Sequence, residues 1–211
     1  MRQLTLIRHA LTEWNASGRF QGHTDIPLSA AGVGQARRLG KHLARLEQGV
    51  DRVYSSPLGR ARQTAEIVFP GRDLVLDERL KELHFGLFEG YTQAQNEAQP
   101  GWAEWYADPF GRAAPGGESY EMLRARALEW MSTLPELPHI AAVTHSGTIQ
   151  MLVSAVLGVE RPTWRKRIFL RHSGVTRILL RGDEALIERV NDTHHLRASK
   201  HPDVAEALLE P

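Results

Sequence analysis

The sequence predicts an α/β protein, a three-layer α/β/α sandwich in which a mainly parallel central sheet lies between two layers of helices. Residues 4–7 and 140–144 are short runs rich in apolar and β-branched residues, without strict alternation, as expected for strands covered on both faces. Helical patterns separate such runs along the chain. Strands that alternate with helices are typical of a parallel sheet with helices on its faces.

The first half of the chain contains three predicted strands and two predicted helices. After the strand at 4–7, residues 15–28 are rich in glycine, proline and aspartate and predict a loop that returns toward that strand. Ser29 is expected to cap a helix over 30–46, where apolar residues recur every three or four positions, and Gly49 to close it. Residues 50–54 and 74–76 predict further strands.

Between those two strands, Ser56 followed by Pro57 predicts a helix start, because a proline at the first helical position leaves no hydrogen bond unmade. Arg60 would then lie about one turn into the helix, with Thr64 one further turn along the same face.

The second half begins with an aromatic stretch over 84–118. These aromatics fit a lid-like insertion of short helices over a site, or a small subsidiary core. Ser119 is expected to cap the next helix, and residues 148–157 predict another. Residues 175–180 and 185–190 predict late strands joined by a turn at Gly182-Asp183. We expect one domain over 1–211, with the insertion at about 84–118.

Composition excludes several classes of function. The chain has 211 residues, with 26 Lys and Arg against 25 Asp and Glu, so no overall charge attracts nucleic acid or an anionic membrane. It has no cysteine, and therefore no disulfide, thiolate metal site or cysteine nucleophile. No apolar segment reaches the length of a membrane span, and no leader pattern precedes the first strand, so a cytoplasmic location is expected.

Polar residues follow two of the buried strands. Arg8 and His9 come directly after the strand at 4–7, and His145 follows the strand at 140–144. Parallel sheets bind ligands beyond the carboxyl ends of their strands, so two histidines distant in sequence are expected at one sheet edge. An arginine and an imidazole there suit the negatively charged oxygens of a phosphoryl group.

Five ordered motifs resemble those of the histidine phosphatase superfamily, which includes the cofactor-dependent phosphoglycerate mutases. They cover residues 4–196, nearly the whole chain. The first motif contains Arg8-His9-Ala10, Thr12-Glu13-Trp14-Asn15, Gly18-Arg19-Phe20-Gln21-Gly22 and Asp25-Ile26-Pro27-Leu28-Ser29. The second is Ser55-Ser56-Pro57-Leu58 with Arg60, and the third runs from Leu80 to Gly90 and includes Glu82. The fourth is Pro115-Gly116-Gly117-Glu118-Ser119, and the fifth is Val143-Thr144-His145 with the later Asn191-Asp192.

The resemblance implies a phosphoglycerate mutase-like fold and a set of residue roles. His9 would be the nucleophile that becomes a phosphohistidine, and Glu82 the acid that protonates the leaving oxygen. Arg8, Arg60 and His145 would bind the phosphoryl group. Substrate-binding positions beyond these would be Asn15, Gln21, Gly22 and Ser146. No cofactor and no metal are expected, because the arginines supply the positive charge that Mg²⁺ would otherwise provide.

The chain departs from the family pattern at two positions. Ala10 and Ser146 stand where the family usually has glycine after each histidine. Both residues are small enough for the backbone to approach a phosphate. A backbone with positive φ would be costly at either position, since only glycine adopts it cheaply.

Two assignments have competitors. Glu89, seven residues after Glu82, is an alternative acid, although its place in Phe88-Glu89-Gly90 favours a structural role. His172 and the pair His194-His195 are alternative metal ligands, but adjacent histidines late in a chain are more commonly exposed or bonded to a carbonyl.

Three functions follow, in order of preference. The first is a phosphatase acting on a small phosphorylated metabolite, resembling α-ribazole phosphatases and broad-specificity phosphatases. The second is a phosphoglycerate mutase that depends on 2,3-bisphosphoglycerate. The third is a nonenzymatic RNA- or partner-binding protein, though its basic residues lack the interleaved aromatics of a stacking surface. These basic residues are Arg161, Arg165, Lys166, Arg167 and Arg171. The sequence leaves open whether the chain forms a homodimer.

Overall fold

The computed structural model describes residues 1–46, 49–161, 168–182 and 184–196. The first half contains β1 (Arg2–Arg8), α1 (Glu13–Ala16), α2 (Ala30–Leu46), β2 (Arg52–Ser55), α3 (Gly59–Val68) and β3 (Leu74–Leu76). The second half contains α4 (Gln93–Asn96), α5 (Trp102–Ala107), α6 (Tyr120–Ser132), β4 (His139–Thr144), α7 (Ser146–Val156), β5 (Val175–Arg181) and β6 (Glu184–Asp192).

The six strands form one sheet in the order β3-β2-β4-β1-β5-β6. The first four in this order run parallel, whereas β5 is antiparallel to β1 and β6 is antiparallel to β5. The prediction of a mainly parallel sheet is therefore confirmed, with two antiparallel strands at one edge. All six predicted strands are present.

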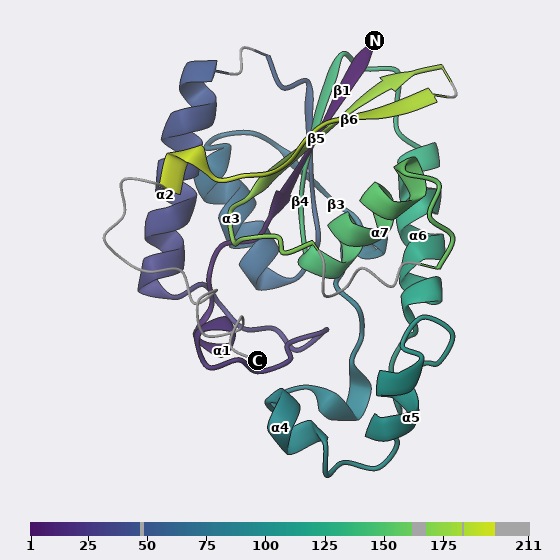
Figure 1. Ribbon diagram of the computed structural model, residues 1–211. Coiled ribbons are helices and arrows are strands. Elements are labelled where there is room, and N and C mark those ends of the chain that lie inside the picture. The colour runs from purple at the N-terminus through teal and green to yellow at the C-terminus, as the bar shows by residue number, and fades with distance from the viewer. Residues whose placement is uncertain (47–48, 162–167, 183, 197–211) are drawn as a thin grey trace.

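Helices cover both faces of the sheet (Figure 1). On one face α2 and α3 pack through residues such as Leu39 and Ala65 against Ile7 of β1. On the other face Trp130 of α6 and Leu152 of α7 pack against Leu6 of β1. Because neighbouring residues of β1 face opposite layers, both sides of this central strand are buried, as its continuous apolar run predicted.

The caps expected for two helices are present. The Ser29 hydroxyl accepts a hydrogen bond from the Gly32 backbone N–H, and that of Ser119 accepts one from Met122. These bonds satisfy backbone donors that have no partner in the first turn of a helix.

The predicted helix start at Ser56-Pro57 is wrong, because α3 begins at Gly59. The Ser56 N–H instead donates to the Val143 carbonyl at 2.9 Å, which extends the contact between β2 and β4. The Asp25 carboxylate accepts the Gly59 N–H at 2.7 Å and so caps α3 from a distant loop. Arg60 is consequently the second residue of the helix.

The 84–118 segment contains α4 and α5 and lies at the end of the molecule toward which β1 runs (Figure 1). Most of its aromatic residues pack together: Trp102, Trp105 and Phe88 are buried, and Leu123 of α6 and Met151 of α7 join them. This cluster is the subsidiary core that the sequence left as one of two alternatives. Within the described residues, no helix has the length and apolarity needed to cross a membrane.

Candidate active site

The pairing of β1 with β4 brings His9 and His145 together. Arg8 is the register partner of Thr144, so the next residue of each strand leaves the sheet at the same place. The His9 N–H still donates to the Thr144 carbonyl at 2.8 Å. The two imidazole ring centroids lie 5.1 Å apart with an interplanar angle of 57°. The expected meeting of two distant histidines at one sheet edge is thus found.

His9 is held as a neutral imidazole with a defined tautomer. Its Nδ1 lies 2.8 Å from the Ala10 carbonyl oxygen, which only accepts hydrogen bonds, so Nδ1 carries the proton and Nε2 keeps its lone pair. Burial lowers the pKa of His9 well below 6.5, and the positive charges of Arg60 and Arg8 lower it further. A neutral imidazole with a free Nε2 is competent as a nucleophile.

Arg60 lies near enough to His9 for its charge to lower the pKa of His9, and it anchors the loop at residues 22–24. The side chain is 1% exposed, and its guanidinium donates to the carbonyls of Gly22 at 2.7 Å and Thr24 at 3.0 Å. Burial lowers the pKa of Arg60 to about 10, against the opposing effect of nearby carboxylates. The guanidinium therefore stays charged at neutral pH.

His145 is the N-cap residue of α7 and is fully buried. Its Nε2 lies 2.8 Å from the Ser56 hydroxyl, while its Nδ1 has no hydrogen-bond partner in the described part of the chain. Burial, followed by the charge of Arg60, lowers the pKa of His145 well below 6.5. Ser56 therefore bonds to a histidine at the strand end.

A third histidine at this edge, His172, is a residue that sequence reasoning did not place in the site. Its ring centroid lies 5.7 Å from that of His9, and it is 8% exposed. Its Nε2 lacks a partner among the described residues. The available signal is topological: β5 runs antiparallel to β1, so the residues just before β5 return to the edge where β1 ends.

The loop that presents His172 is fixed to the end of β1. Ser173 has a φ of +58°, uncommon for a residue other than glycine, and its N–H is shared between the carbonyls of Arg8 and His9 at 3.0 and 3.3 Å. The Arg8 guanidinium donates to the Leu170 carbonyl in the same loop.

Glu82 faces the site from the segment between β3 and α4. Its Oε1 accepts the Leu83 N–H at 2.8 Å, and its Oε2 accepts the Gly147 N–H at 3.1 Å. A Cβ at Gly147 would lie 2.3 Å from Oε1, so the carboxylate leaves no room for a side chain there. Glu82 is half-buried and lines the pocket beside His9.

Glu89 has a different environment. Its carboxylate accepts hydrogen bonds from the backbone N–H groups of His23, Thr24 and Phe85 at 2.8–3.1 Å, and one from the Thr24 hydroxyl. These four donors tie the 20–24 loop to the segment after Glu82. Glu89 is not among the residues that line the pocket around His9.

A pocket of about 330 Å³ opens over His9. The sequence-derived residues Arg8, Asn15, Gln21, Gly22, Arg60 and Glu82 all line it, together with Gly18, Arg19, Phe20, Phe85, Gln93, Phe169 and His172. His145 does not line it, but its ring lies next to that of His9. Ser146 is the first residue of α7 and does not line the pocket.

The pocket loop depends on local backbone contacts. The Asn15 side-chain oxygen accepts from the N–H and hydroxyl of Thr12, and neither of these bonds uses the Nδ2 amide group, the side chain's donor. Gly22 has a φ of +52°, and a Cβ there would lie 1.9 Å from a Glu89 oxygen. The positive φ and the close approach of Glu89 therefore both favour glycine at position 22.

Ala10 and Ser146 accept their positions without backbone strain. In the described residues, positive φ outside glycine occurs at Ser173 and Asn191 and not at these two. The Ala10 N–H donates to the Thr64 hydroxyl at 3.0 Å, which connects the end of β1 to α3. The departures from the family pattern thus fit an ordinary backbone.

The remaining sequence alternatives lie elsewhere. His194 and His195 lie near His42, with ring centroids 6.2 and 5.7 Å from it. Within the described ranges no group of three His, Cys, Asp or Glu side chains is arranged to hold a metal. Of the basic residues considered for a binding role, Arg165, Lys166 and Arg167 lie outside the described residues, and Arg161 pairs with Asp108.

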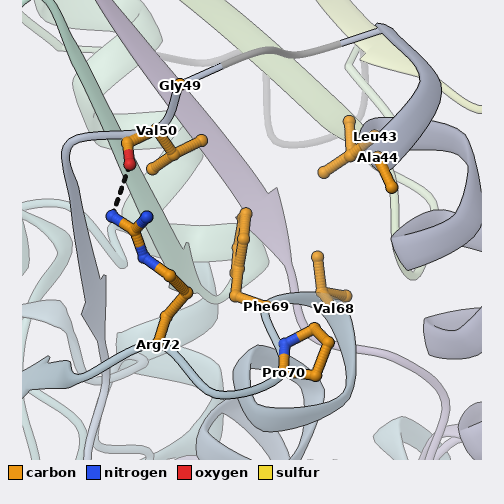
Figure 2. Close-up of a pocket in the computed structure, with 8 residues that line it drawn as sticks. All are labelled: Leu43, Ala44, Gly49, Val50, Val68, Phe69, Pro70 and Arg72. Carbon is orange, nitrogen blue, oxygen red and sulfur yellow. Dashed lines mark hydrogen bonds between the residues drawn. The ribbon is translucent and has the colours of Figure 1, made fainter.

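A second cavity, of about 230 Å³, lies away from the histidines (Figure 2). It is lined by Leu43 and Ala44 of α2, by Val68 to Pro70 at the end of α3, and by Gly49 and Val50 before β2. Arg72 closes one side and donates to the Val50 carbonyl. Because Val50 precedes β2 and Ser56 follows it, this cavity lies at the opposite end of that strand from the active-site edge.

Comparison with known proteins identifies the family of the chain. Residues 4–193 match the family described as histidine phosphatase superfamily (branch 1). A probable phosphoglycerate mutase GpmB from Salmonella paratyphi B is 35% identical over 94% of this chain and 96% of its own length.

Two solved structures are similar over nearly the whole fold. A phosphoserine phosphatase from Entamoeba histolytica in complex with 3-phosphoglyceric acid has a TM-score of 0.82 and 29% identity, covering 93% of this chain and 100% of that one. An α-ribazole phosphatase from Shigella flexneri has a TM-score of 0.81 and 26% identity, covering 90% and 96%. The chain belongs to the histidine phosphatase superfamily, branch 1.

Proposed function

We propose that this protein is a phosphatase that hydrolyses a small phosphorylated metabolite through a phosphohistidine on His9. The observation that carries the proposal is the hydrogen bond from His9 Nδ1 to the Ala10 carbonyl, which leaves Nε2 unprotonated. Nε2 attacks phosphorus and forms a P–N bond as the ester P–O bond breaks. Water then attacks the same phosphorus, the P–N bond breaks, and inorganic phosphate leaves.

The positive charge required for this transfer comes from Arg8 and Arg60. Negative charge spreads over the three equatorial oxygens of the phosphoryl group in the transition state, and two guanidiniums can bind them through several parallel hydrogen bonds. His145 supplies a further imidazole beneath the same group. With these residues in place, the proposal requires neither a cofactor nor a metal.

Glu82 is the proposed acid and base. Its proton passes to the leaving oxygen in the first step, and the carboxylate takes a proton from the attacking water in the second. Glu89, the alternative acid, already accepts four hydrogen bonds that hold the 20–24 loop and does not line the pocket. This difference in surroundings supports Glu82.

Asn15, Gln21 and Gly22 are proposed to contact the substrate from the pocket wall, which they line. Ser146 is proposed to contribute through its backbone at the start of α7, next to His145. Phe85 and Gln93 of the 84–118 segment also line the pocket, which supports a role for this insertion as a cover over the bound substrate.

The distribution of charge in the pocket favours a phosphatase over a mutase. Beyond Arg8 and Arg60, the described lining includes one further cation, Arg19, whose guanidinium donates to the Gly90 carbonyl. The rest of the outer wall includes Phe20, Phe85 and Phe169. A bisphosphoglycerate brings a second phosphate and a carboxylate, for which this wall offers little compensating charge. A single phosphate with a weakly charged leaving group fits better.

The mutase remains the second candidate because of one observation, the 35% identity to a probable phosphoglycerate mutase over 94% of the chain. A panel of phosphorylated metabolites, assayed with and without 2,3-bisphosphoglycerate, separates the two. We expect phosphate release that does not depend on the bisphosphate. Interconversion of phosphoglycerates without phosphate release would establish the mutase, and no reaction with any substrate would favour the nonenzymatic binder.

A further inference from the structure

Arg126 of α6 is a hydrogen-bonding centre that lies outside the pocket. Its guanidinium donates to the backbone carbonyls of Arg79 at 2.8 Å, Lys81 at 2.7 Å and Glu82 at 2.7 Å. It also forms a two-pronged pair with Glu118, with nitrogen to oxygen distances of 3.0 and 2.9 Å. One planar side chain therefore holds three carbonyls of the segment that leads to the proposed acid.

Glu118 extends this arrangement to the base of the 84–118 segment. Its backbone N–H donates to the His84 carbonyl at 2.8 Å, and its carboxylate accepts the His84 N–H at 3.0 Å. Burial raises the pKa of Glu118, but the hydrogen bonds and charge of Arg126 outweigh burial and bring the pKa below its ordinary value. The carboxylate stays ionised and keeps Arg126 in place.

The Glu82 backbone is consequently fixed from two sides. Its carbonyl accepts from Arg126 and also from His23 Nε2, at 2.9 Å. Two threonine hydroxyls hold the preceding carbonyls: Thr144 donates to Leu80 at 2.6 Å and Thr148 to Lys81 at 2.8 Å. The α7 residue Gly147 then sets where the carboxylate lies: its N–H donates to Oε2, and its lack of a side chain leaves the space that Oε1 occupies.

We propose that Arg126 is the positioning residue for proton transfer by Glu82, with Glu118 as its partner. The proposal rests on the proposed function of Glu82. Arg126 does not line the pocket, so it acts through the backbone of residues 79–82 and not on the substrate. Proton transfer needs heavy atoms within hydrogen-bond reach, and a displacement of about 1 Å costs on the order of 10²-fold in rate. Nucleophilic attack by His9 does not depend on that distance.

The test compares burst rates of phosphoenzyme formation with two substrates, p-nitrophenyl phosphate and an alkyl phosphate. Nitrophenolate leaves without a proton, whereas an alkoxide needs one. In Arg126→Met we expect the alkyl burst to slow by about 10²-fold and the nitrophenyl burst to stay within about threefold. Arg126→Lys keeps the charge but not the planar fork of donors. Its burst rate with the alkyl phosphate should therefore lie between those of the wild type and Arg126→Met.

Arg124→Met is the matched control on the same helix. Arg124 donates to the Glu160 carbonyl, outside the 79–82 segment, so its loss should leave both burst rates at the wild-type value. Equal slowing of both substrates in folded Arg126→Met would show a merely structural role and overturn the proposal. If Arg126→Met does not fold, the ratio of the two rates in Arg126→Lys decides: a wild-type ratio overturns the proposal, and a selective alkyl loss supports it.

The same experiment separates this proposal from the proposed function. Absence of a phosphoenzyme in the wild-type protein would contradict the function of His9 itself. A wild-type phosphoenzyme with an unchanged substrate ratio in both Arg126 variants would contradict the positioning role alone.

Discussion

The imidazole rings of His9 and His145 lie 5.1 Å apart although 135 other residues separate them in the chain. Adjacent parallel strands end side by side, and the Arg8–Thr144 pairing makes each histidine the first residue beyond its strand. Both imidazoles are buried next to two guanidiniums, so both stay neutral near pH 7. The positive charge of the site therefore comes from its arginines.

Exchange of Glu82 for glutamine should slow substrates with poor leaving groups far more than those with good ones. An amide cannot donate the proton that an alkoxide needs, so the burst rate with an alkyl phosphate should fall by about 10²- to 10⁴-fold. The burst with p-nitrophenyl phosphate should change little. Rapid quenching of both reactions provides the measurement, and equal slowing of the two substrates would remove Glu82 from the acid's role.

Glu89→Gln is the companion variant and should behave differently. Loss of its charge weakens four hydrogen bonds at once. A hydrogen bond to a charged group typically contributes about 1.5–3 kcal/mol to stability. We expect a fall of about 2–3 kcal/mol in the free energy of unfolding in urea, with no dependence of the residual burst on leaving group. The exposed Glu97→Gln serves as control. A leaving-group-dependent loss in Glu89→Gln would transfer the acid's role to Glu89.

Gly22 and Gly71 offer a matched pair of glycines, of which only Gly22 lines the pocket over His9. Both have positive φ, but a Cβ at Gly22 would lie 1.9 Å from a Glu89 oxygen, whereas Gly71 has nothing within 4 Å. Gly71→Ala should cost about 1–2 kcal/mol of stability from the backbone alone. Gly22→Ala should cost about 1–3 kcal/mol more and also reduce kcat/KM, because Arg60 donates to the Gly22 carbonyl. If the two variants lose the same stability and the same kcat/KM, this account of the loop is refuted.

His172 should make the protein less stable in mild acid. Burial lowers the pKa of His172 well below 6.5, so the unfolded chain takes up a proton there that the folded chain does not. Stability is thus lost as the pH falls below about 6.5. When the pH falls from about 7.5 to about 5.5, the free energy of unfolding of His172→Asn should decrease by about 1.4 kcal/mol less than that of the wild type. Urea unfolding at the two pH values measures this, with the exposed His194→Asn as control; an unchanged pH dependence in His172→Asn would contradict it.

Activity should survive EDTA and be inhibited by vanadate. Arg8 and Arg60 supply the positive charge of the proposed mechanism, so chelation should leave kcat unchanged. Vanadate adopts the five-coordinate geometry of the transition state and should bind at least about 10²-fold more tightly than phosphate. Steady-state assays with both additives test this. Complete loss on chelation, restored by Zn²⁺ or Mg²⁺, would revive the metal alternative.

The sequence predicted those parts of the site that follow from strand ends and short motifs. Arg8, His9 and His145 were expected at one edge because apolar runs end there, and the structure brings them together. His172 was not placed because its position depends on β5 running antiparallel to β1, which periodicity does not reveal.

Non-local hydrogen bonds account for most of the remaining differences. The start of α3 was placed too early because Ser56 continues the contact with β4, and because Asp25 caps the helix from another loop. Arg126 could not be assigned from sequence for the same reason: its acceptors, including the carbonyls of Arg79 and Lys81, lie about 45 residues earlier in the chain. A helical arginine has no local signature for such contacts.

The central claim is that His9 accepts the phosphoryl group through Nε2 and that water removes it. The most direct measurement is rapid quenching of a single turnover with a ³²P-labelled phosphomonoester, followed by digestion and identification of the labelled residue and ring nitrogen. We predict an acid-labile, base-stable phosphohistidine on Nε2 of His9, formed before phosphate appears and absent in a folded His9→Ala variant that has lost at least about 10⁴-fold in turnover. Label on another residue, or rapid phosphate release with no phosphoenzyme at any time, would contradict the account.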